Sequence, residues 1–155
     1  MAKRHPALVE VSRDHHEGLL LALRLQQGEQ ALPKLWSHET AWQVRFLATF
    51  FEEHLRNHFK VEEDEIFPIA ETRIAEAVPI VNTLREDHRF FENAVRSMSE
   101  RPESVTRDEL AGFGKRLEDH IRMEDRTLFL LMENHLPEAL LEKLSRDVQS
   151  YYPSR

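Results

Sequence analysis

The stretch HFKVEEDEIF at residues 58–67 is repeated, with changes, as HIRMEDRTLF at residues 120–129. Each copy places a histidine four residues before a glutamate, so that the two side chains share one face of a helix. A second acidic residue follows the glutamate, and an aliphatic residue and a phenylalanine close each copy. The repeat predicts two similar helical halves that bring imidazoles and carboxylates together.

A shorter motif, aspartate followed by histidine, stands before each copy, as Asp14-His15 and as Asp87-His88. Imidazole and carboxylate groups together form a donor set that suits iron, manganese and zinc. One His-x-x-x-Glu alone would indicate no more than a solvated helix pair in so acidic a chain. The ordered series of four motifs makes a transition-metal site the first hypothesis.

The composition indicates one highly charged helical domain. The 155 residues are enough to bury a core; 41% are hydrophobic, 32% are charged and only 4 are glycine. The absence of cysteine excludes disulfides, thiolate ligands and a cysteine nucleophile. No apolar run approaches the roughly 20 residues of a membrane span, and no secretory leader is evident. With a net charge of -7 and no basic stripe, we expect a cytoplasmic protein that binds neither membrane nor nucleic acid.

Hydrophobic residues recur with a helical period along the whole chain, and no segment alternates as a half-buried strand would. Five helices are expected: from near Pro6 to about Gln30, from after the N-cap Ser37 to near Pro68, from around Pro79, from the capping box Thr106–Glu109 to about Asn134, and a short one after Pro137. Four long amphipathic helices with short connections predict an all-α fold. The expected architecture is an up-down-up-down four-helix bundle with a short C-terminal fifth helix, as one domain over residues 1–155.

Six polar residues lie in phase with the apolar stripes rather than on solvent faces: His15, His58, Glu62, His88, His120 and Glu124. Their burial is costly unless they are paired or bind a cation, and two metal ions would relieve this cost for all six. Two octahedral ions need about 12 ligand positions. Bridging glutamates, the imidazoles and a bridging oxo or hydroxo group would fill most of them, which leaves an opening for O2, NO or peroxide.

Two further histidines compete for a place in this set. His16 stands beside His15 on a broad apolar face, but the parallel with Asp87-His88 favours His15. His54 lies one turn before His58 on the same predicted face. It is a candidate for a fifth imidazole ligand or for a donor that orients a carboxylate, and a plain core histidine is the alternative.

Four acidic residues flank the candidate ligands: Asp14, Glu63, Asp87 and Asp125. The preferred interpretation is that they lie on solvated faces and form surface ion pairs. The alternative is that they accept hydrogen bonds from the imidazole N–H groups and so fix the ring tautomers.

This ordered pattern resembles the hemerythrin-like, or HHE cation-binding, domain family, and the resemblance covers nearly the whole chain. It is carried by Asp14-His15, His58-x-x-x-Glu62, Asp87-His88 and His120-x-x-x-Glu124 with the following Leu-Phe. The resemblance implies a four-helix bundle with a non-haem di-iron centre that binds or senses oxygen, nitric oxide or iron. It also implies a ligand assignment: His15 and His58 on one metal, His88 and His120 on the other, and Glu62 and Glu124 bridging.

One departure from the family pattern bears on function. Oxygen-carrying hemerythrins have a further histidine one turn before the position of His88, and this chain has Leu84 there. One metal is therefore expected to lack a protein imidazole. This disfavours stable oxygen carriage and favours sensing, redox or scavenging chemistry.

The predicted metal site suggests three alternative functions. The leading one is a protein with two iron ions, or with manganese or zinc in their place, that binds or senses a small diatomic or peroxide. The second is an oxidase- or peroxidase-like di-iron enzyme, with His54 as the candidate proton donor. The third is an interaction module that reports metal or redox state to a protein partner, with the short fifth helix as its contact surface.

Overall fold

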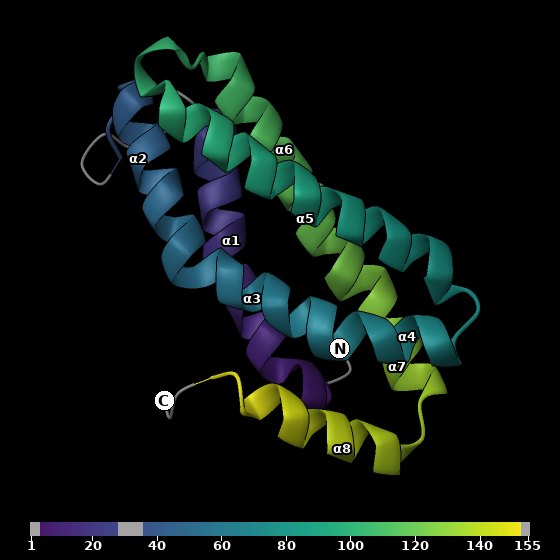
Figure 1. Cartoon of the computed structure of the whole chain (residues 1–155). Helices are drawn as coiled ribbons and strands as arrows, with labels where there is room; N and C mark the ends of the chain where they lie inside the picture. The colour runs from purple at the N-terminus through teal and green to yellow at the C-terminus, as the bar shows by residue number, and fades with distance from the viewer. Residues whose placement is uncertain (1–3, 28–35, 153–155) are drawn as a thin grey trace.

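The computed structural model describes residues 4–27 and 36–152, and within these ranges every regular element is helical. The all-α prediction is confirmed. The helices shown in Figure 1 are α1 (Pro6–Gln27), α2 (Thr40–Phe50), α3 (Arg56–Val61), α4 (Phe67–Arg73), α5 (Ala77–Glu100), α6 (Arg107–Met123), α7 (Phe129–His135) and α8 (Glu138–Gln149). No helix in the described ranges is long and apolar enough to cross a membrane.

Three short π-helical segments, called π-turns below, join shorter helices into longer runs within the described residues. They are η2 (Phe51–Leu55), η3 (Glu62–Ile66) and η5 (Glu124–Leu128). A continuous run thus extends over residues 40–73, and a second over residues 107–135. The first run changes direction near η2 (Figure 1), as is common where a π-turn interrupts an α-helix. The turns η3 and η5 begin at the two glutamates of the repeated motif, so the repeat in sequence is also a repeat in backbone conformation.

The predicted end of the second helix near Pro68 is wrong, because the helix continues to Arg73. In η3 the Phe67 N–H bonds to the carbonyl of Glu62, five residues back, and the helix resumes at once. Pro68 then lies in the first turn of α4, where a missing N–H costs least.

Of the other predicted helix ends, one is confirmed and one is wrong. The capping box is present: Thr106 Oγ1 accepts from the Glu109 N–H at 3.2 Å, and the Glu109 carboxylate accepts from the Thr106 N–H at 2.8 Å. Ser37 is not an N-cap, since α2 is preceded by Glu39 and has no side-chain cap. The expected end of the first helix at Gln30 lies outside the described residues.

Helices α1 and α6 approach closely through glycines. A Cβ on Gly114 would lie 2.5 Å from the Ala22 carbonyl oxygen, and one on Gly18 would lie 2.9 Å from Ile121 Cδ1. One apolar cluster includes this contact region, and a second cluster, which includes residues of α8, fills the rest of the interior. Helix α8 closes one end of the molecule (Figure 1), where it packs on α1 and η3 and buries Leu141, Leu144 and Val148 as expected.

Candidate metal centre

The six core-phase residues of the sequence meet in the interior of the molecule. His15 comes from α1, His58 from α3, His88 from α5 and His120 from α6, and all four rings are buried. Glu62 and Glu124 occupy the first positions of η3 and η5 and are 0% exposed. All six side chains therefore belong to one buried cluster.

Their ligand atoms fall into two groups, each with all atoms within 4.8 Å of one another: His15, His58, Glu62 and Glu124, and Glu62, His88, His120 and Glu124. Both groups contain the same two glutamates. Each group has two imidazoles and two carboxylates, which is a donor set that transition metals accept.

The two groups are related by an approximate two-fold repeat. His15 Nε2 lies 2.9 Å from Glu124 Oε1, and its counterpart His88 Nε2 lies 3.0 Å from Glu62 Oε1. His58 Nε2 lies 3.4 Å from Glu62 Oε2, and its counterpart His120 Nε2 lies 3.6 Å from Glu124 Oε2. The repeated sequence thus produces matched contacts in which each half supplies a glutamate to the other.

The outward ring nitrogens contact the four flanking acidic residues. The pairs are His58 Nδ1 with Asp14 at 3.2 Å, His88 Nδ1 with Glu63 at 2.9 Å, His120 Nδ1 with Asp87 at 3.0 Å and His15 Nδ1 with Asp125 at 2.9 Å. The preferred interpretation of these residues as solvated was wrong. A carboxylate at Nδ1 holds the proton there and turns Nε2 toward the centre.

Further donors, which the sequence did not single out, hold these carboxylates. Arg116 donates to Asp87 at 2.9 Å, and Ser12 donates to Asp125 at 3.1 Å. The Tyr152 hydroxyl, near the end of the chain, donates to Asp14 at 2.7 Å. Such long-range partners leave no local signal in a sequence. The four acidic residues did leave a local signal, since each of them stands next to a candidate ligand in the sequence.

Several inward atoms have no hydrogen-bond partner within the described residues, although they are buried: Glu62 Oε2, His120 Nε2 and Glu124 Oε2. Buried carboxylate oxygens without donors are costly, and a cation removes that cost. The residues present therefore fit a metal ion.

The charges of the cluster support the same conclusion. Burial opposes protonation of His120, but the negative charges of Glu124, Asp87 and Glu62 outweigh it and raise its pKa to about 10. Burial also opposes ionisation of Glu62, yet the nearby His58 and hydrogen bonds hold its pKa well below the usual range. Protons on imidazoles thus supply countercharge that a metal cation would replace.

The two competing histidines stay outside both groups. His16 is exposed on α1, whereas its neighbour His15 is buried. His54 is exposed on η2, where its ring packs 4.8 Å from the Phe50 ring centroid. The predicted inward position of His54 is wrong because the π-turn changes the helix register, and Leu55 is buried instead.

A buried cluster of imidazoles and carboxylates within an all-helical fold defines the class of this molecule, a cation-binding helical protein. The family described as hemerythrin HHE cation binding domain matches residues 7–131, a range that includes all six clustered residues. The chain belongs to this family. Comparison with curated proteins and with solved structures gives no match.

Proposed function

We propose that the protein holds two iron ions in a non-haem centre and binds or senses a small ligand such as O2, NO or peroxide. The observation that carries this proposal is the pair of four-residue groups that share Glu62 and Glu124. In this proposal residues 1–155 form one hemerythrin-like domain, an up-down-up-down four-helix bundle closed by α8. A cytoplasmic location and a protein partner stay predictions.

The proposed ligands divide between the two positions. His15 and His58 would hold one ion, His88 and His120 the other, and Glu62 and Glu124 would bridge them. Iron is the ion implied by the family resemblance, and manganese or zinc would suit the same nitrogen and oxygen donors. When bound, the metal pair supplies Lewis acidity and one-electron redox chemistry to a small ligand.

The residues of the chain prepare the site for that chemistry. The four Nδ1 contacts with carboxylates fix the imidazole tautomers and ring orientations. Phe59 stacks on His88 at a centroid distance of 4.0 Å, and Phe91 packs edge-on to His120 at 5.4 Å. These rings cover His88 and His120 with apolar surface. Leu84, which is fully buried, offers no donor where oxygen carriers have a histidine, and this supports sensing or scavenging over carriage.

The test is the metal content of protein purified from iron-supplied cells, measured by plasma mass spectrometry. We expect about two irons per chain, in line with two groups of nitrogen and oxygen donors. His58→Ala and His120→Ala should each lower this content, and His16→Ala, an exposed neighbour of the cluster, should not. Protein that stays free of metal after anaerobic reconstitution with iron or manganese would overturn the proposal.

A second candidate function is an oxidase- or peroxidase-like activity. It is favoured by a cavity that leads from the surface to His15 and His58 and that has His54 in its lining. His54 would deliver a proton to a ligand in that cavity. If His54→Ala leaves both the spectra with O2, NO and peroxide and any peroxide consumption unchanged, this second candidate loses its support.

A further inference from the structure

The cavity beside the centre is much larger than a diatomic ligand needs. It lies between α1, the run formed by α2, η2 and α3, and α6, with a volume of about 480 Å³. A water-sized molecule takes up about 30 Å³. Sites for small organic ligands commonly range from about 300 to 1,000 Å³. The cavity therefore has room for a small organic ligand.

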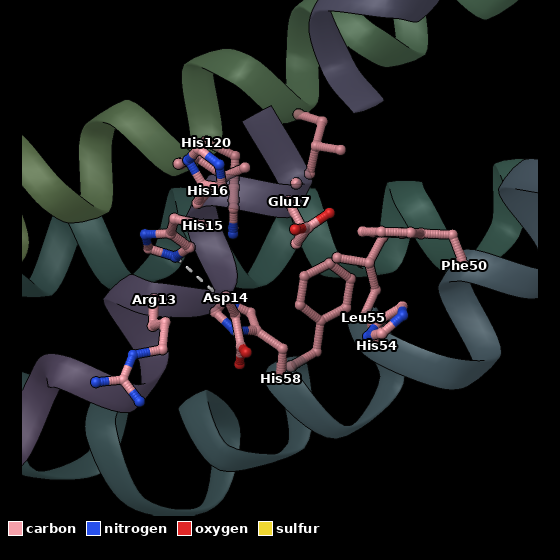
Figure 2. Close-up of a pocket in the computed structure, with 14 residues that line it drawn as sticks. Arg13, Asp14, His15, His16, Glu17, Phe50, His54, Leu55, His58 and His120 are labelled. Carbon is pink, nitrogen blue, oxygen red and sulfur yellow. Dashed lines mark hydrogen bonds and ion pairs between the residues drawn. The ribbon is translucent and has the colours of Figure 1, made fainter. Parts of the chain in front are cut away.

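The lining of the cavity has two chemically different parts. His15, His58 and His120 form the part next to the centre, as Figure 2 shows for its labelled residues. The walls are apolar and consist of Phe50, Leu55, Phe59, Leu117 and Ile121. Arg13, His16, Glu17 and His54 line its outer part, and Asp14 and Gly18 complete the lining (Figure 2). A ligand that fits this lining has one polar end and an apolar body.

The repeat accounts for the space on the His15 and His58 side of the centre. Alignment of Asp14-His15 with Asp87-His88 places Gly18 opposite Phe91. The Phe91 ring is fully buried and fills the interior of the second half, 5.1 Å from the Phe113 ring and 5.4 Å from His120. Gly18 has no side chain to fill the matching space in the first half, and it lines the cavity.

The entrance differs between the halves in the same way. Alignment of His58 with His120 places His54 opposite Arg116. Arg116 donates to Asp87 and lies 4.1 Å above the Phe90 ring, so that its side chain is held against α5. His54 packs on Phe50 and lines the cavity. Both replacements leave the His15 and His58 side open.

We propose that this cavity binds an organic hydroperoxide with a compact apolar body. The body lies against Phe50, Leu55 and Phe59, which line the cavity. The oxygen end lies at the imidazoles of His15 and His58. This assignment rests on the proposed function for the nature of the oxygen end, and on the cavity alone for the apolar body.

The test uses 2-phenyl-2-propanol, the unreactive alcohol that corresponds to cumene hydroperoxide. Isothermal titration calorimetry on the purified protein should show saturable binding. His54→Trp, which places a large ring at the entrance, should weaken binding about tenfold or more. Glu53→Trp is the matched control, because Glu53 is exposed on the same π-turn and does not line the cavity. It should bind as the wild type does.

Metal content measured on the same samples separates this inference from the proposed function. Binding of the alcohol by protein that takes up no metal would support the cavity and overturn the di-iron centre. Metal uptake without saturable binding of the alcohol would support the metal centre and overturn the inference about the cavity. Equal binding by wild type and His54→Trp would also overturn the inference, because the alcohol would then lie elsewhere. A band of the metal-loaded protein that shifts with the alcohol would place its oxygen end at the centre.

Discussion

At each histidine of the cluster, Nδ1 contacts a carboxylate outside the cluster and Nε2 faces the centre. The carboxylate fixes which ring nitrogen carries the proton. Asp87 shows this arrangement best, since it is itself buried, contacts His120 Nδ1 and accepts from Arg116. Burial disfavours the charge of Asp87, but His120 and Arg116 outweigh this and lower its pKa. The ring of His120 is therefore held by a group that stays ionised.

Asp87→Ala should lower metal affinity by about 10- to 100-fold, because the tautomer and orientation of His120 would no longer be fixed. Competition with a chromophoric chelator measures this affinity. Asp119→Ala is the matched control, since Asp119 is next to His120 in sequence but pairs with Lys115 on the surface. Equal affinities in the two variants would contradict the role of Asp87.

Tyr152→Phe should accelerate metal loss several-fold, because Asp14 loses the hydroxyl that donates to it at 2.7 Å and His58 is then held less firmly. Stopped-flow release into excess chelator measures the rate. Tyr151→Phe serves as the control, because its hydroxyl donates to Asp64 and Glu65, away from the cluster. The same acceleration in both variants would indicate general loosening of the chain end.

The ligand residues could be predicted from the sequence, but the contacts of the acidic residues beside them could not. The six clustered residues were identified because the repeat places each on an apolar stripe. The interpretation of the four acidic residues was wrong, because a solvated face and a contact with imidazole differ only by a small rotation of the helix. That rotation depends on packing between helices, which one sequence does not contain.

At the scale of elements, the contact between α1 and α6 depends on the absence of a side chain at Gly114. Gly114→Ala would force a methyl group to 2.5 Å from the Ala22 carbonyl oxygen, and α1 would have to move. We expect a loss of about 1–3 kcal/mol in the free energy of unfolding, as for an overpacked core. Urea unfolding monitored by circular dichroism measures it.

Gly112→Ala provides the contrast on the same helix. A Cβ at Gly112 meets nothing within 4 Å, and the residue is exposed. This substitution should stabilise the protein by about 0.5–1 kcal/mol, because glycine is a poor helix former. Destabilisation by both substitutions would show that helix α6, rather than its contact with α1, is sensitive.

The start of α6 should give the protein a pH-dependent component of stability. Hydrogen bonds from Arg101 and from the Thr106 N–H lower the Glu109 pKa from 4.5 to about 2. Because the folded-state pKa is the lower one, this stabilisation is complete above about pH 4.5 and is lost as the pH falls toward 2. Glu109→Gln should therefore lower the melting temperature at pH 7, with a difference that shrinks at acidic pH. A difference that stays constant down to pH 2.5 would contradict this account.

The helices themselves were largely predictable, since their hydrophobic period and the capping box at Thr106 are local signals. The π-turns were not. Because of them, Pro68 lies inside a continuous helical run and His54 lies at the surface. A helix with one wider turn has the same composition as a regular helix, but the residues after the turn face in a different direction. The cavity could not be predicted either, because it depends on which helix faces meet. Its one local signal is that Gly18 stands opposite Phe91 when the two halves of the sequence are aligned.

At the scale of the whole molecule, removal of metal should weaken the fold. The cluster buries two carboxylates that each have an inward oxygen without a hydrogen bond within the described residues, so a bound cation stabilises the folded state selectively. At a free metal concentration about 1,000 times the dissociation constant, this amounts to about 4 kcal/mol. Thermal unfolding with and without chelator measures it, and equal melting temperatures would contradict burial of the ligands around a metal.

The crossed contacts between the halves have a consequence for the origin of the chain. Glu63 of the first half contacts His88 of the second, and Asp125 of the second contacts His15 of the first. Such reciprocal pairing is the contact pattern of a symmetric dimer, in which one surface meets its own copy. A gene that fused two copies of one ancestral half would retain the centre and free each copy to diverge. Gly18 opposite Phe91 would be a divergence of this kind, since Gly18 lines the cavity and Phe91 is a buried ring.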